Sequence, residues 1–588
     1  MLDDVADAAA QLGLLHPPGV LAVQGDRARG GPDHPVDHAQ GRRLAAAGGP
    51  DQDGDLAAGC LETQAVDSNS AVRKLLRDTV EGDHADQPNP AHRQGATGAI
   101  LAGVTQPVHL DGRSLDLDAL ERAAQGAPAS IEPAAMAAAE RSHQHAAEVS
   151  SRRPVYGRTT GVGAAREEST DSKVDHGLRL LRSHAAGWGE VMPSTVVRAA
   201  LAVRANQLLA GGSGANPVLA QTLADLVGAP DEDLPVVHRY GSLGTGDLTA
   251  LAEVGLALIG ERERSGGERR ADVQLTSADA LPLMSSNAFA IAETGLHAAS
   301  LHALARAADT VCALSFVALQ GNPEAVSETA AAATPFRGAR EVIRVLGELL
   351  ADQPGEPAHL QDFFGLRTWP QVHGPVLDTI LDLKAVVETA ANTASENPLF
   401  TGTGDVAEVT HHGGFHAAYL VLAVDTTLLA LTRSAQAVQS RISHTLTDSD
   451  SGLPLFLSDS TMGSSGVLIA EYVAASALST IRGVASTPSS VQTAGVSAGI
   501  EDDASFAGQA AMRLGDATAA YRRMLAVELV CTVRALRMRG VVPIGELGEA
   551  FARCESLPAG VEDRDLSPEL ATAEHIVERY AVSTPEER

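Results

Sequence analysis

The sequence predicts a mainly α-helical protein, an elongated bundle of long helices with a smaller mixed portion near its N-terminus. Two observations predict this fold class. Long stretches after residue 172 repeat apolar and small residues at helical spacing, whereas strand-like segments are few and short. No fixed-period repeat occurs, which disfavours a solenoid. The 588 residues are 44% hydrophobic and 20% charged, as in a globular protein with a large core.

Residues 1–104 differ from the rest of the chain. No Trp, Tyr or Phe precedes Tyr156, and Gly, Pro, Asp, Gln and Ala dominate the first hundred residues. Such a segment buries too little apolar surface to offset its ordering entropy, so we expect a disordered or mis-annotated extension. A small Ala-rich helical extension is the alternative. Because a strand-like opening begins at Val104, we hypothesise that this residue, read as Met, is the true start.

The portion 105–300 is the candidate catalytic portion, and it contains a cluster of glycines at Gly241, Gly244 and Gly246. A phosphate-binding loop would need Lys and Ser or Thr after the last glycine, but Asp247 follows instead. Taken alone, the cluster is an ordinary turn before a helix over 247–260, with Asp247 as the N-cap.

The portion 301–588 is expected to be a bundle of long helices. In the stretch 375–397, apolar residues recur at alternating spacings of four and three, which places them on one helix face. They are Val376, Ile380, Leu383, Val387, Ala390 and Ala394. Further long helices are predicted over 413–440, 464–485 and 505–539, with stripes of small residues that suit close helix packing.

Charge and composition exclude several classes of function. The net charge of −30 argues against nucleic-acid binding, and the uninterrupted apolar runs are too short to span a membrane. Four single cysteines fit a reducing cytoplasm and form neither a disulfide framework nor a zinc site. His412 and His416 lie four apart beside His411, but no acidic residue at zincin spacing accompanies them, so no metal is expected.

Several motifs occur in one order along the chain, and together they are more specific than the glycine cluster. They are VYGRTTGVG (155–163), LLRSHAAGWGE (180–190), RANQLLAGGSG (204–214), GSLGTGDLTALAE (241–253), QDFFGLRTWPQVHG (361–374), SENPLF (395–400), HGGFHA (412–417) and IEDDAS (500–505). In this order they resemble the aromatic amino-acid ammonia-lyases, with histidine ammonia-lyase the nearest relative. The resemblance covers about residues 105–540 and implies the helical fold of the histidine and phenylalanine ammonia-lyases.

The resemblance implies an internally generated cofactor. In the family an Ala-Ser-Gly tripeptide cyclises and loses two waters to give a methylidene-imidazolone electrophile, so no external cofactor is needed. The matching tripeptide here is Gly244-Thr245-Gly246, in which small flanking residues permit a sharp bend and Thr245 supplies the β-hydroxyl. The glycines are thus expected to bend the chain so that it reacts with itself.

The resemblance also implies the remaining roles. Tyr156 matches the base that removes the β-hydrogen, a task that needs a strongly lowered pKa. Arg367 matches the arginine that pairs with the substrate carboxylate. Glu501 and His184 match residues that face a polar ring and favour imidazole over phenyl. Other site-lining positions match Asn206, Gln361, Asn397 and Phe415.

Three positions depart from the family pattern. Thr245 replaces serine in the tripeptide, and Phe364 stands where the family has a tyrosine. In a gapless comparison Ser285 takes the place of the asparagine that supports the electrophile, with Asn287 two residues on. On a helix, two positions would turn Asn287 away by about 200°.

The primary hypothesis is therefore an ammonia-lyase that converts L-histidine or a similar aromatic amino acid into its α,β-unsaturated acid, a urocanate-type product. Alternatives are an aromatic amino-acid 2,3-aminomutase, a phenylalanine or tyrosine ammonia-lyase, and a non-catalytic relative that serves as a binding or assembly module. The resemblance implies a cytoplasmic homotetramer whose active sites draw residues from several chains, with a small amino acid as the ligand.

Overall fold

The computed structural model describes residues 106–170, 175–402 and 408–583. The predicted extension 1–104 and the hypothetical start at Val104 lie outside these residues. All the described residues fall within one compact unit by internal contacts. The expected boundary at residue 300 falls inside helix α9 (Ala288–Leu319), which runs through it without a break. The two expected portions are therefore joined by a continuous helix.

The N-terminal part combines short helices with small two-stranded sheets, as expected for the smaller mixed portion. Strands β1 and β2 pair in parallel, and β3 and β4 pair antiparallel. The elements are β1 Val108–Leu110, α2 Leu117–Ala124, β2 Ala129–Ile131, α3 Pro133–Arg152, α4 His176–His184, β3 Trp188–Val191, α5 Ser194–Leu209, α6 Pro217–Val227, β4 His238–Tyr240, α7 Leu248–Leu258 and α8 Ala280–Met284.

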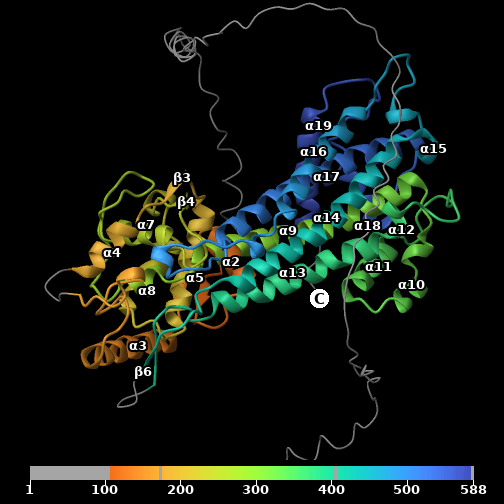
Figure 1. The fold of residues 1–588 in the computed structure, drawn as a ribbon. Helices are drawn as coiled ribbons and strands as arrows, with labels where there is room; N and C mark the ends of the chain where they lie inside the picture. The colour runs from red at the N-terminus through yellow and green to blue at the C-terminus, as the bar shows by residue number, and fades with distance from the viewer. Residues whose placement is uncertain (1–105, 171–174, 403–407, 584–588) are drawn as a thin grey trace, which may run out of the picture. The chain divides into compact units, whose positions relative to one another are not determined.

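Long helices form the rest, and Figure 1 shows α9, α13, α14 and α17 running side by side. The elements after α9 are α10 Glu328–Ala333, α11 Arg337–Leu350, α12 Phe364–Arg367, α13 Trp369–Ala391, β5 Leu399–Thr401, β6 Glu408–Thr410, α14 Ala418–Leu446, α15 Asp448–Ser451, α16 Leu468–Ala485, α17 Ala507–Arg539, α18 Gly545–Ala552 and α19 Ser567–Ser583. One hydrophobic core runs from β1 to α19. The predicted helical class is confirmed.

The long helices pack as their apolar spacing predicts. On α13 the four residues Val376, Ile380, Leu383 and Val387 are all buried. Ala394 lies beyond the helix, which ends at Ala391. Helix α14 begins at Ala418 rather than 413, because Gly413 and Gly414 precede it in a turn.

In the part of the chain that the structure describes, three stretches are long and apolar enough to cross a membrane by length and composition: Ala280–Leu319, Ala418–Leu446 and Leu468–Val491. From the short uninterrupted apolar runs, we expected no stretch long enough to span a membrane. By length and composition that expectation is wrong, because these helices intersperse small polar residues among their apolar ones. In the first stretch, 78% of the most apolar window is buried inside the structure, against 33% in the third. Helix α9 is thus a core helix, whereas α16 leaves apolar side chains such as Tyr472 exposed.

A buried polar network joins α9, α13, α14 and α17. Arg441 pairs with Glu528 and lies over the ring of Trp369, with the guanidinium carbon 4.1 Å from the ring centroid. The indole N–H donates to Asp309 at 2.8 Å. Burial raises the pKa of Asp309 to about 7, against the hydrogen bond from Trp369 and the charge of Arg441, which both lower the pKa.

This raised pKa predicts a pH-dependent stability. Between its ordinary pKa of 3.8 and about 7, the folded Asp309 binds a proton that the unfolded chain has released, so stability falls as pH rises through this window. We expect Asp309→Asn, which retains the acceptor for Trp369, to remove about 2–4 kcal/mol of that decline. Urea unfolding at several pH values measures it. Equal slopes for the variant and the wild type would contradict the prediction.

Candidate active site

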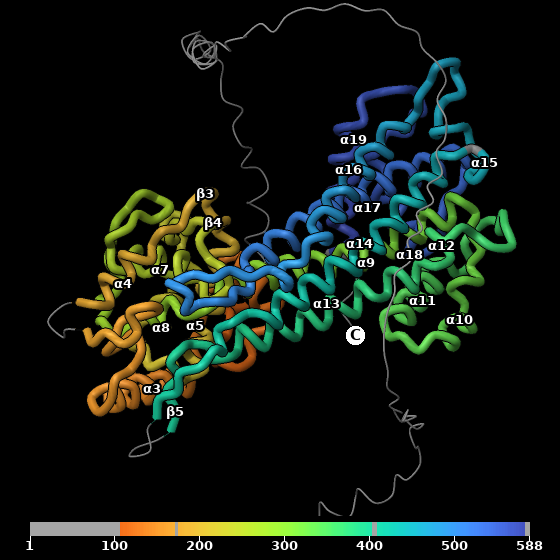
Figure 2. Tube along the Cα trace, viewed as in Figure 1, coloured from red at the N-terminus to blue at the C-terminus, as the bar shows by residue number. Residues whose placement is uncertain are grey.

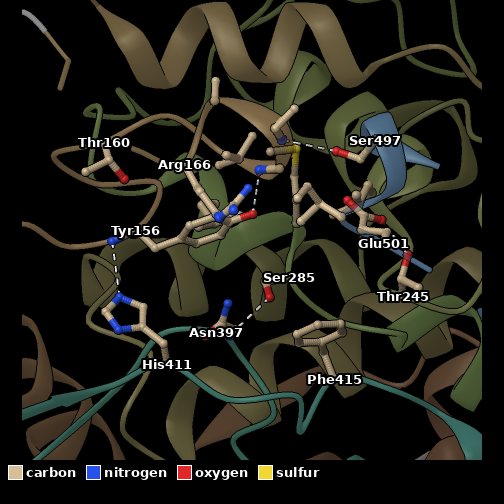
Figure 3. Close-up of a pocket in the computed structure, with 18 of the residues that line it drawn as sticks. Tyr156, Thr160, Arg166, Thr245, Ser285, Asn397, His411, Phe415, Ser497 and Glu501 are labelled. Atoms are coloured by element: carbon tan, nitrogen blue, oxygen red, sulfur yellow. Dashed lines mark hydrogen bonds between the residues drawn. The ribbon is translucent and has the colours of Figure 1, made fainter. Parts of the chain in front are cut away.

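A cavity of about 810 Å³ brings together seven of the residues predicted from sequence. Figure 3 shows several of them around one space, contributed by segments far apart in the chain. The seven are Tyr156, His184, Thr245, Ser285, Asn397, Phe415 and Glu501. The walls come from the loop after α3, the end of α4, the loop before α7, the end of α8, and the segments before α14 and α17.

The glycine cluster forms the sharply bent loop that the tripeptide requires. Gly241, Gly244 and Gly246 have φ angles of +137°, +81° and +110°, which favour glycine. The Gly244 carbonyl accepts a hydrogen bond of 2.9 Å from the Ser505 hydroxyl. Half-buried Thr245 points toward the cavity, where its hydroxyl donates to Glu501 at 3.4 Å.

Asp247 follows this loop, but its side chain does not cap α7. Instead, Asp247 Oδ2 accepts hydrogen bonds from the backbone N–H groups of Phe289 (2.8 Å) and Ala290 (3.0 Å), at the start of α9. Its own N–H donates to the Ser286 carbonyl at 2.6 Å. Burial raises the pKa of Asp247 to about 6, while the two backbone donors oppose this shift. Asp247 therefore occupies the N-cap position of α7, as expected, but its carboxylate binds the first turn of α9, which begins 41 residues later at Ala288.

The support for the loop comes from Asn287. Its Oδ1 accepts a hydrogen bond of 3.1 Å from the Gly246 N–H, and its side-chain amide donates to the Phe415 carbonyl. Asn287 was expected to point away from the loop if it lay on a helix with Ser285. It lies between two helices instead, because α8 ends at Met284 and α9 starts at Ala288. Ser285 instead accepts a hydrogen bond of 3.2 Å from the Asn397 N–H.

We predict that Asn287→Ala destabilises the protein more than Ser285→Ala. The first change leaves a buried N–H and a carbonyl without their partner, at about 1–3 kcal/mol each, and the second removes the acceptor of one hydrogen bond. Unfolding free energies of the two variants provide the comparison. If Ser285→Ala costs as much as Asn287→Ala, the assigned support is wrong.

Tyr156 lies in the cavity with its hydroxyl accepting a hydrogen bond of 2.8 Å from the Gly163 N–H. Burial raises the pKa of this phenol and nearby Glu501 raises it further, while the Gly163 bond and Arg166 lower it. The net shift is upward, opposite to the shift that a base requires. In the single chain, the effect of desolvation on the pKa of Tyr156 is thus larger than the opposing effects of the Gly163 N–H and Arg166.

Two other cavity residues have local partners. His184, the last residue of α4, contacts the Leu180 carbonyl through Nδ1 at 2.9 Å, which leaves its other ring nitrogen for the cavity. Asn397 Oδ1 accepts a hydrogen bond of 2.9 Å from the His412 N–H, so this amide is fixed by the chain that leads to Phe415.

Four predicted site residues lie away from the cavity. Asn206 is fully buried and bonds Gly112, Ala391 and Asn392, so in this chain it joins α5 to the ends of neighbouring segments. The other three, Gln361, Phe364 and Arg367, lie in or beside α12, at the far end of the long helices from α8 (Figure 1).

The far position of Arg367 follows from the length of α13. This helix separates it from Asn397 with 23 residues, about 35 Å at 1.5 Å per residue. The Arg367 guanidinium carbon lies 4.6 Å from the centroid of the Phe364 ring, which is 65% exposed. The pair faces outward.

The cavity is also lined by residues that were not predicted from the sequence, among them Thr160, Arg166, His411 and Ser497. Arg166 lies three residues after the VYGRTTGVG motif, and Figure 3 shows it beside the Tyr156 ring. His411 accepts a long hydrogen bond of 3.3 Å from the Tyr156 N–H. These additional cavity residues lie in or within a few positions of the motifs, and this is the signal in the sequence that could have identified them. Among the described residues, no three His, Cys, Asp or Glu side chains gather as a metal site.

Comparisons with known proteins agree with the motifs. Residues 115–554 match the family described as Aromatic amino acid lyase. A histidine ammonia-lyase from Streptomyces avermitilis is 32% identical over 462 residues, covering 74% of this chain and 89% of the relative. The histidine ammonia-lyase structure from Trypanosoma cruzi is 25% identical with a TM-score of 0.73, covering 81% of this chain and 94% of that one.

A tyrosine aminomutase structure from Streptomyces globisporus shares the fold, with 24% identity, a TM-score of 0.74, and coverage of 81% of this chain and 97% of that one. The family match spans most of the chain, and several of the motifs inside it supply walls of the cavity. This chain belongs to the aromatic amino acid lyase family and is a carbon–nitrogen lyase.

Proposed function

We propose that the protein eliminates ammonia from L-histidine or a closely similar aromatic amino acid to give the α,β-unsaturated acid. The observation that carries the proposal is the meeting of Tyr156, Thr245 and Glu501 in one cavity of about 810 Å³. A volume of this size suits a small-molecule ligand. His184 and Glu501 give the cavity polar groups for a ring that bears nitrogen, which supports imidazole over phenyl.

The loop residues fit a methylidene-imidazolone-type group formed from Gly244-Thr245-Gly246, with the threonine methyl retained on its reacting carbon. The positive φ angles at both glycines supply the bend, and the Gly246 N–H and the Gly244 carbonyl are each held by a polar side chain. Thr245 carries the hydroxyl that the second dehydration needs. When formed, the group supplies an electron-poor carbon that makes the substrate amine a better leaving group.

The remaining residues bind and orient the substrate and move its proton. Tyr156 takes the β-hydrogen, helped by the Gly163 N–H, which stabilises the phenolate by a hydrogen bond. The positive charge of Arg166 lowers the pKa of Tyr156 and so acts in the same direction. Glu501 and His184 hold the side chain of the substrate, while Asn397 and Phe415 form the opposite wall.

We further propose a cytoplasmic homotetramer in which Arg367 serves the cavity of another subunit. Two features support this arrangement: Arg367 and Gln361 lie about 35 Å along α13 from their own cavity, and apolar side chains stand exposed on α14 and α16. Examples are Tyr419 and Tyr472, which are 83% and 63% exposed. Burying such residues against copies of the chain would stabilise the assembly.

A complementation experiment tests the shared site. Tyr156→Phe and Arg367→Gln are each expected to lose most activity, and subunits mixed during refolding should regain a part, because some sites then contain both native residues. Mixing two preparations of the same variant is the control. No recovery from correctly assembled mixed tetramers would place both residues in one subunit's site.

The substrate is tested by incubating the protein with L-histidine, L-tyrosine and L-phenylalanine and measuring ammonia and the unsaturated acid. We expect histidine to give both products. A β-amino acid without free ammonia would identify an aminomutase instead. No product from any of the three, with an unmodified loop, would favour a non-catalytic relative.

A further inference from the structure

The carbonyl of Gly244 is held by a single buried hydroxyl. Ser505 Oγ donates to the Gly244 oxygen at 2.9 Å, and Ser505 is 5% exposed. One residue later, the Phe506 N–H donates to the Leu243 carbonyl at 2.8 Å. The segment that leads into α17 therefore donates hydrogen bonds to two successive carbonyls of the loop, those of Leu243 and Gly244. Figure 2 shows this segment reaching back toward α5 and α8.

This close approach accounts for glycine at position 244. A Cβ atom there would lie 2.0 Å from Ser505 Oγ and 2.8 Å from the Ala507 backbone nitrogen. Neither distance is compatible with a methyl group unless the α17 segment moves away. The φ angle of +81° disfavours a side chain as well. Glycine at position 244 thus allows the Ser505 hydroxyl to reach the Gly244 carbonyl.

The nucleophile of ring closure is held from the opposite direction. The Gly246 N–H donates to Asn287 Oδ1 at 3.1 Å, just before α9. The oxygen that gains charge during closure therefore meets a donor, whereas the nitrogen that attacks has its proton directed to an acceptor. Each partner matches the polarity that the reaction develops.

We propose that Ser505 is the residue that catalyses closure of the loop into its ring, by stabilising the oxygen of Gly244. The proposal rests on the proposed function. The nitrogen of Gly246 attacks the carbonyl carbon of Gly244; the N–C bond forms, and the π pair moves onto oxygen. The Ser505 hydroxyl stabilises the charge on this oxygen through its hydrogen bond. The oxygen takes up a proton from solvent and the attacking nitrogen releases its proton to solvent, so no atom is gained or lost.

The hydroxyl formed in this step leaves as the first water together with the N–H proton of Thr245, and the second water takes the Thr245 hydroxyl and its α-hydrogen. The N-terminal end of α17 lies against Gly244, where the positive end of the helix dipole favours a negative charge on the loop.

The test follows the mass of the loop peptide over time in full-length chains made by cell-free translation, so it does not depend on catalytic turnover. Removing one oxyanion donor costs about 10²–10³ in rate, and we expect Ser505→Ala to slow the first loss of water by this factor. Ser242→Ala is the matched control, because its hydroxyl is in the same loop but lies 3.3 Å from Thr249 Oγ1.

Folding is monitored in parallel by circular dichroism and the unfolding midpoint. If Ser505→Ala fails to fold, Ser505→Thr retains the hydroxyl and must cyclise, while Ser505→Cys offers only a weak donor and must be slow. A folded Ser505→Ala protein that cyclises at the wild-type rate overturns the proposal and leaves the proposed function standing. A wild-type loop that never loses water overturns both, and the wild-type control reveals this.

Discussion

Replacing Tyr156 by phenylalanine is expected to lower kcat for ammonia release by about 10²–10⁴-fold and to leave the fold intact. The change removes only the hydroxyl, so the ring still packs in the cavity wall while the proton acceptor is lost. The hydroxyl bonds one backbone N–H, that of Gly163, beside a cavity that water can enter. Initial rates with L-histidine and the circular dichroism spectrum measure the two effects.

The pH profile makes the test of Tyr156 sharper. A base must be deprotonated, so the wild-type rate should rise with pH toward the raised pKa of this phenol. The rise should disappear in Tyr156→Phe. Tyr240→Phe is the control, since Tyr240 lies on β4 and is 51% exposed. A Tyr156→Phe enzyme with wild-type kcat would remove Tyr156 from the mechanism.

Replacing Thr245 by alanine is expected to abolish activity, because alanine has no β-hydroxyl to leave as the second water. The loop peptide should then lose one water at most, while the wild-type peptide loses two. Thr245→Ser should instead raise kcat about tenfold, equivalent to ~1.4 kcal/mol, since it removes the methyl group from the reacting carbon. Peptide masses and ammonia assays on the same preparations measure both effects.

Thr249→Ala serves as the control for these changes, because its hydroxyl contacts Ser242 rather than the cavity. Full activity in Thr245→Ala, with the loop at its unmodified mass, would show that elimination proceeds without the electrophile. A Thr245→Ser enzyme slower than the wild type would show that the cavity is shaped around the extra methyl group.

The helices of the bundle could be predicted from sequence because apolar spacing alone defines their buried faces. The ends were harder: α17 starts at Ala507, within two residues of the prediction, whereas α14 starts five residues late because of Gly413 and Gly414. Local sequence also predicted the sharp bends at Gly244 and Gly246, since motif and glycine content agree there.

The supports of the loop could not be predicted, because they depend on tertiary contacts. Ser505 is 261 residues from Gly244, and no local pattern joins them. Asn287 was expected to turn away only because a helix was assumed where the chain passes between two helices. Arg367 could be recognised from its motif, but its distance from the cavity depends on the course of α13, which a list of motifs does not contain.

The contacts of the glycine loop also determine when it can react. Its backbone is held by Asn287, 41 residues away, and by Ser505, while Asp247 is tied to the first turn of α9. Contacts this distant in sequence form late, after the chain has paid the entropy of closing large loops. A partly folded chain therefore lacks the geometry for cyclisation. A loop that has cyclised indicates that the long helices had already packed together.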